Sequence, residues 1–171
     1  LTLEMLRRKP DSALVWYEDF RDEEKIPESY WTVLSGEWDV WQDPDSTANR
    51  PYSQLEGYGQ LAWNYSGFSD IHMRAQIIFP EDGVGKAGIF LGSLFCCYNY
   101  DSQRVELYEG STLKGSYATS FSKTSKADLR SNPNVYTIEM RKRGNKVRVY
   151  SSASNTLRFT ATVSDVSGYA G

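Results

Sequence analysis

The sequence contains few of the residues from which metal and redox sites are usually built. Its 171 residues include one histidine, His72, and two cysteines, Cys96 and Cys97. A single histidine excludes histidine-rich metal cages and makes a Cys-His nucleophile a weak hypothesis. Because the two cysteines are adjacent, they close no long loop and leave the redox compartment undetermined. We expect two free thiols, since a vicinal disulfide would strain the intervening peptide bond.

Long apolar runs and an excess of basic charge are also missing. No stretch approaches the ~18 apolar residues that a membrane-spanning helix needs, and 19 Lys and Arg stand against 22 Asp and Glu, for a net charge of -3. We therefore expect no membrane span. We also expect no nucleic acid partner, because binding to a phosphate backbone requires a basic surface. No Gly-x-Ser-x-Gly, P-loop or dinucleotide-binding pattern occurs in a strand-turn-helix context.

Aromatic residues are abundant, with 12 Tyr, 7 Phe and 5 Trp. Such a content suits strands and ligand surfaces. From Leu14 onward, apolar and polar residues alternate in short runs bounded by turn formers, which is typical of antiparallel sheets. The clearest run is Asp70–Phe79. A second run, Val135–Arg143, leads through Gly144 and Asn145 into Lys146–Tyr150, and this order predicts a hairpin.

These runs and nine further ones predict roughly a dozen short strands in one all-β, antiparallel, two-sheet sandwich of the jelly-roll type. The length suits a single domain, which we assign to residues 14–171. Residues 1–13 are predicted to be an N-terminal extension or linker. Leu1–Ser12 suits a short helix that Pro10 would end, and it suits a tag, a linker or the edge of an upstream module equally. The nine further strands are Val15–Phe20, Trp31–Leu34, Glu37–Gln42, Gly59–Trp63, Ala87–Leu91, Phe95–Tyr100, Arg104–Tyr108, Ser116–Phe121 and Thr156–Val163.

The order of these motifs resembles a known superfamily. The matching segments are Tyr17–Phe20, Trp31, Gly36–Val40, Gly59–Leu61, Phe68–Asp70, Gly85–Leu91, Arg104–Leu107, Tyr136–Arg141 and Lys146–Tyr150. Together they resemble the concanavalin A-like lectin/glucanase superfamily, also called laminin G-like. The pattern is similar to levanase-type carbohydrate-binding modules and to 3-keto-disaccharide hydrolase-like domains. The resemblance specifies a fold better than a function, because its motifs are structural.

The resemblance also indicates an open edge. In this superfamily a Gly-rich segment such as Gly168–Gly171 normally opens a final strand, and the sequence stops there. We therefore expect either an unpaired edge at Val15–Phe20 or the absence of the closing strand from this sequence.

Strand alternation places a set of polar side chains opposite the core, on what we predict to be one binding face. Planar Arg and Glu groups suit sugar hydroxyls, and aromatic rings stack on the C–H face of a sugar. Trp41 and Trp63 lie near predicted loops and are the candidates for stacking, although core burial suits them equally. The candidate ligand-binding residues are Trp41, Trp63, His72, Arg74, Gln76, Tyr98, Arg104, Glu106, Glu139, Arg141 and Arg148.

We predict a non-catalytic carbohydrate-binding or adhesion module, extracellular or at the cell surface, covalently attached to neighbouring modules. No cofactor is expected; structural calcium has weak candidate ligands in Glu18, Asp19, Asp43 and Asp45. The alternatives are a structural or protein-interaction module, or a sugar-processing enzyme using Glu106, Glu139 or His72. The paired carboxylates that glycoside hydrolysis requires are not in register in this sequence.

Overall fold

The computed structural model describes residues 2–9, 12–18, 26–42, 53–64, 66–82, 85–125, 127–128, 132–151 and 156–171, with the backbone alone for 2–9, 12–18, 41–42, 53–54 and 56. Within these residues every regular element is a strand, in agreement with the predicted all-β class. The strands are β1 (Thr2–Lys9), β2 (Ser12–Glu18), β3 (Trp31–Gln42), β4 (Ser53–Trp63), β5 (Ile71–Ile77), β6 (Lys86–Leu91), β7 (Leu94–Asn99), β8 (Arg104–Glu109), β9 (Thr112–Ala118), β10 (Tyr136–Arg143), β11 (Lys146–Ser151) and β12 (Thr156–Thr162).

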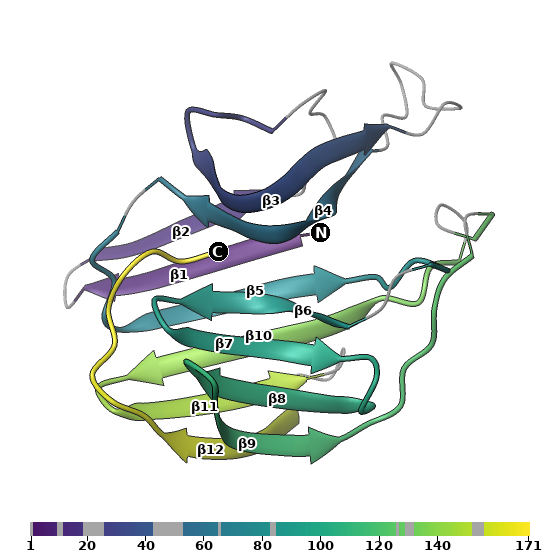
Figure 1. Cartoon of the computed structure of the whole chain (residues 1–171). Coiled ribbons are helices and arrows are strands. Elements are labelled where there is room, and N and C mark those ends of the chain that lie inside the picture. Colours follow the sequence, from purple (N-terminus) through teal and green to yellow (C-terminus); the bar gives the residue numbers. More distant parts are fainter. Residues whose placement is uncertain are drawn as a thin grey trace.

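The strands form two facing layers, and all named pairs are antiparallel (Figure 1). One layer is a six-stranded sheet in the order β12-β11-β10-β5-β1-β2. The other contains a four-stranded sheet, β6-β7-β8-β9, and the β3-β4 pair. The predicted two-sheet antiparallel sandwich is confirmed.

The C-terminal residues join the β3-β4 pair to the four-stranded sheet. Trp63 N–H donates to the carbonyl of Ala170 (2.9 Å), and Phe90 exchanges backbone hydrogen bonds of 2.7 and 3.1 Å with Gly171. Figure 1 shows this yellow segment ending beside β4. Gly168–Gly171 therefore form a strand-like connection between β4 and β6, while β2 lies at the outer edge of the six-stranded sheet.

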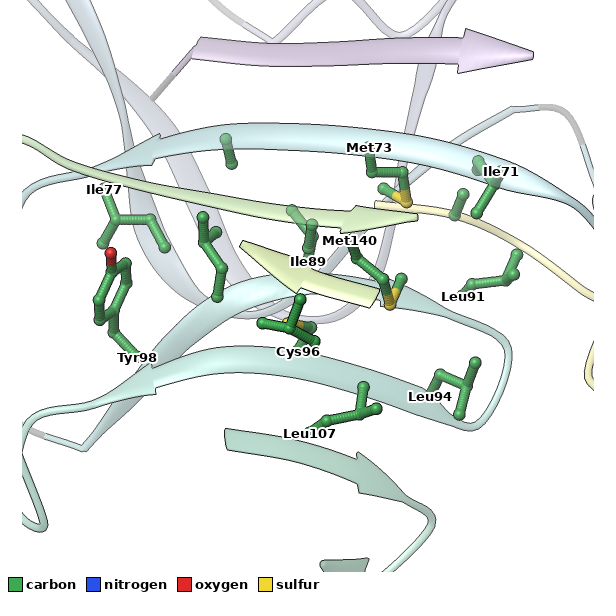
Figure 2. Close-up of a cluster of buried hydrophobic side chains, with 14 of the residues drawn as sticks. Ile71, Met73, Ile77, Ile89, Leu91, Leu94, Cys96, Tyr98, Leu107 and Met140 are labelled. Atoms are coloured by element: carbon green, nitrogen blue, oxygen red, sulfur yellow. The ribbon is translucent and has the colours of Figure 1, made fainter. Parts of the chain in front are cut away.

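The core lies between the two layers and follows the period of two that the sequence shows. On β5, Ile71, Met73, Ala75 and Ile77 are buried, whereas the residues between them are half-buried or exposed. Figure 2 shows Met73 of β5 and Met140 of β10 facing Ile89 of β6. Burial of such side chains is the main stabilising contribution, about 1.5–3 kcal/mol for each large one.

Three sequence predictions differ from the structure. Thr2–Lys9 form β1, paired with β5, instead of a helix in an extension; the alternation of Leu3 and Met5 with charged residues also satisfies a strand. Trp31–Gln42 form one strand rather than two, because a bulge at Val33/Ser35 carries the strand through Gly36 at φ 77°. The strand predicted at Ser116–Phe121 lies earlier, at Thr112–Ala118, because it follows directly on the tight turn at Gly110.

Candidate functional site

The outer face of the six-stranded sheet carries a compact group of polar side chains. Because Ile138, Met140, Val147 and Val149 point into the core, the residues between them on β10 and β11 point outward. The strand register brings the outward residues together in two neighbouring rows across β11, β10 and β5. One row is Arg148, Arg141 and His72, and the other is Tyr150, Glu139 and Arg74.

Glu139 lies at the centre of this group and is almost completely buried, at 2% exposure. Its Oε1 accepts a short hydrogen bond from Arg141 Nε. The same oxygen lies 2.6 Å from His72 Nε2, at the distance of an ion pair but without hydrogen-bond alignment. Burial would raise the pKa of Glu139, but the contacts with His72 and Arg141 outweigh it and lower the pKa. Glu139 is therefore a fixed anion between Arg141, which donates to it, and His72.

Arg141 is held from two sides. Glu139 binds Nε, and the guanidinium carbon lies 4.3 Å from the ring centroid of Tyr150. The side chain is still 41% exposed. These contacts reduce the conformational freedom of the guanidinium before any ligand arrives, and such preorganisation lowers the entropic cost of binding.

Three polar side chains around Arg141 remain available. Arg74 is half-buried, and Gln76 and Arg148 are exposed. Among the residues that the structure describes, none of the three makes a hydrogen bond or ion pair through its side chain. Within the described part of the chain, this face therefore combines one fixed donor group with guanidinium and amide groups that have no side-chain partner.

The outer face of the four-stranded sheet carries a different polar cluster, centred on Glu106 at 5% exposure. Its carboxylate accepts hydrogen bonds from Asn99 (2.9 Å), Tyr108 (2.7 Å) and Ser102 (3.1 Å), and Lys86 lies 3.8 Å away. Burial would raise the pKa of Glu106, but these donors outweigh it and lower the pKa. The cluster satisfies itself, and we interpret it as structural.

The predicted ligand-binding residues are thus divided between two opposite surfaces. His72, Arg74, Gln76, Glu139, Arg141 and Arg148 share the six-stranded sheet, whereas Arg104 and Glu106 lie on the four-stranded sheet. The prediction of a single polar face is therefore wrong. Alternation along a strand shows which residues face away from the core, but it does not show to which sheet the strand belongs.

Two aromatic residues that were predicted to contact a ligand, Trp63 and Tyr98, are buried instead of lying on the surface. Trp63 is 5% exposed and stacks on Phe68, with ring centroids 5.6 Å apart. Tyr98 is 2% exposed, and its hydroxyl donates to the carbonyl of Thr137 (2.8 Å). Both belong to the core, because each lies on the inward face of its strand. The side chain of Trp41 lies outside the described residues.

A shallow groove on the β3-β4 pair was not predicted. It has a volume of about 480 Å³ and is lined by Trp38, Tyr58, Glu37, Asp39, Gly57 and Pro80. Tyr58 is 64% exposed. A Cβ at Gly57 would lie 2.8 Å from the Trp38 ring, so the glycine leaves room for the indole. The signal in the sequence was an aromatic residue between two glycines, Gly57 and Gly59.

The calcium prediction falls largely on residues that the structure does not describe. Asp19, Asp43 and Asp45 lie outside the described residues, and Glu18 is described in its backbone alone. Within the described residues, no group of three or more His, Cys, Asp and Glu side chains could hold a metal ion. A calcium site at the predicted ligands stays a prediction. In the same described part, no helix is long and apolar enough to cross a membrane.

Comparison with known proteins reveals a similar fold without a close sequence relative. No family model matches the sequence, and no curated protein matches it. Among solved structures, the chain resembles the carbohydrate binding module CBM66 from Bacillus subtilis, with a TM-score of 0.57 and 15% sequence identity, over 82% of this chain and 91% of that chain. At this identity the likeness establishes a shared β-sandwich fold.

Proposed function

We propose that this protein is a non-catalytic carbohydrate-binding module that uses the outer face of the six-stranded sheet. The observation that carries the proposal is the contact between Glu139 and Arg141. The buried carboxylate of Glu139 binds Nε of Arg141 and holds the arginine in place, while the guanidinium stays partly exposed. A solvated Arg–Glu pair on a sheet surface does not require a buried anion. A binding site benefits from one, because it fixes the donor that meets the ligand.

The chemistry of the surrounding groups suits sugar hydroxyls. Arg74, Arg148 and Gln76 present several N–H donors and one amide acceptor at the edge of Arg141. A flat array of planar donors can form pairs of hydrogen bonds with adjacent hydroxyls. The similarity of the fold to a carbohydrate binding module supports this assignment. We extend the proposal to an extracellular or cell-surface protein with covalently attached neighbouring modules.

An enzymatic function is less well supported by the same geometry. Glycoside hydrolysis requires a carboxylic acid with a raised pKa beside a second carboxylate. Glu106 and Glu139 both have lowered pKa values, and they lie on opposite outer faces of the sandwich. Neither is therefore suited to act as the general acid.

A glycan-array screen of the full chain, followed by calorimetric titration of the bound glycans, tests the proposal. We expect saturable binding that Arg74→Ala and Arg141→Ala each weaken about tenfold or more, in line with the loss of a charged hydrogen bond worth about 1.5–3 kcal/mol. The matched control is Arg104→Ala, which removes an arginine from the other sheet. Absence of any glycan binding by the folded protein, or equal affinities for all three variants and the wild type, would disprove the proposed site.

A further inference from the structure

The rows of the proposed binding face place like charges side by side. Arg141 of β10 lies directly opposite Arg148 of β11, and Arg74 of β5 lies in the adjacent row, opposite Glu139. Like charges directly opposite each other on one sheet face destabilise a sheet. The fold itself gains nothing from this arrangement.

In the two rows, the described cations also outnumber the described carboxylates. Glu139 is the carboxylate at the centre of the rows, and the register sets Glu4 of β1 opposite Arg74. Among the described side chains of the two rows, three arginines stand beside one carboxylate, Glu139. The chain as a whole carries a net charge of -3, so a general excess of basic residues does not explain the cluster.

Two lysines of the four-stranded sheet have acidic partners, whereas Arg104, Lys146 and Arg158 donate to hydroxyl groups. On the four-stranded sheet, Lys114 pairs with Glu109 at 2.9 Å, and Lys86 lies 3.8 Å from Glu106. Arg148 is exposed and makes no such contact among the described residues. Its β12 neighbour in the register is Thr160, which is uncharged.

We infer that the carbohydrate bound at this face carries an anionic substituent, a carboxylate or a sulfate ester. The inference rests on the proposed function and specifies its ligand class. A carboxylate or sulfate accepts two parallel hydrogen bonds from a guanidinium, and it would relieve the repulsion between Arg141 and Arg148. Arg141, oriented by Glu139 and Tyr150, supplies the fixed donor, and Arg148 and Arg74 flank it.

Two matched pairs of polymers test the inference. They are polygalacturonate with its carboxyl-reduced form, and carrageenan with its desulfated form, titrated at low salt and at 0.5 M NaCl. We expect at least one anionic polymer to bind about tenfold more tightly than its neutral partner, with the difference decreasing at high salt because exposed charges are screened. Which pair shows the difference distinguishes carboxylate from sulfate recognition.

The variants Arg148→Gln and Arg104→Gln remove the same charge from opposite faces. Arg148→Gln should weaken binding of the anionic polymer about fivefold or more and weaken binding of the neutral form by a smaller factor, whereas Arg104→Gln should change neither. Because Arg148 is exposed, its substitution should not prevent folding, which circular dichroism checks.

The possible failures are distinguishable. Equal affinity for the charged and neutral polymers, still lost in Arg141→Ala, would overturn the anionic inference and leave the proposed function standing. Equal binding of both polymers, duplex DNA and anionic lipid vesicles would mean non-specific attraction of polyanions and would also overturn it. Absence of binding to these polymers and to the glycan array would overturn both proposals.

Discussion

The hydroxyl of Tyr98 donates a 2.8 Å hydrogen bond to the backbone carbonyl of Thr137 and so joins the two sheets of the sandwich. Tyr98 belongs to β7 and Thr137 to β10, 39 residues apart in the sequence. The ring of Tyr98 also contacts Phe121 and Tyr136, with centroids 5.3 and 5.8 Å away. Thr137 and Glu139 are alternate residues of β10. The bonded carbonyl therefore belongs to the strand that carries the centre of the proposed binding face.

Removal of this hydroxyl should destabilise the fold. We expect Tyr98→Phe to lower the free energy of unfolding by about 1–2 kcal/mol, because a buried carbonyl loses its donor. Urea denaturation followed by tryptophan fluorescence measures the change. Tyr100→Phe is the matched control: its hydroxyl has no hydrogen bond among the described residues, so its midpoint should stay within error of the wild type. Equal midpoints for the two variants would contradict the role assigned to the Tyr98 hydroxyl.

Relief of the charge repulsion between Arg141 and Arg148 should stabilise the free protein. We expect Arg148→Gln to raise the free energy of unfolding by about 0.2–1 kcal/mol at low salt, the range measured for cross-strand pairs. Thermal unfolding at 20 mM and 500 mM NaCl measures it, and the gain should shrink as salt screens the pair. Arg104→Gln should show no gain, because Arg104 donates to Ser116 at 2.8 Å. A loss of stability in Arg148→Gln would show that this arginine has a structural partner.

Acid should remove the contribution of Glu139 to stability. Its folded-state pKa is lower than the ordinary value of 4.5, so its contribution is complete above about pH 4.5 and falls as the pH drops through the folded-state pKa. We expect Glu139→Gln to be less stable than the wild type at pH 7, with the difference shrinking below pH 4.5. Urea denaturation from pH 7 to pH 3 checks this. A difference that stays constant over that range would show that the ionised form is not the stabilising one.

Both cysteines should resist thiol reagents in the folded protein. They are free and buried, and burial raises the pKa of Cys97 to about 12, with the nearby Glu106 carboxylate adding to the rise. At pH 8 the thiolate fraction of such a group is ~10⁻⁴. We expect iodoacetamide to label neither residue in the native state and both in 6 M guanidinium chloride, as mass spectrometry would show. Rapid labelling of the native protein would mean that the β7 strand opens locally.

The sequence determined the strands and the inward side of most of them. The alternation in Ile71–Ile77 predicted which β5 residues are buried, because a strand has a strict period of two. Gly144 and Asn145 predicted the β10-β11 hairpin, since glycine tolerates the positive φ of 54° that the turn requires. These features depend on residues close together in the chain.

Tertiary structure alone decided which strands lie side by side. The sequence put Glu106 and Glu139 on one polar face, and the fold separates them onto opposite faces, because β8 and β10 belong to different sheets. The fold also buries Trp63 and Tyr98, which no local pattern in the sequence distinguishes from exposed aromatic residues. The juxtaposition of Arg141, Arg148 and Arg74 arises from the register between β11, β10 and β5. Register between strands distant in the chain is set by packing of the whole core, which a reading of single strands does not contain.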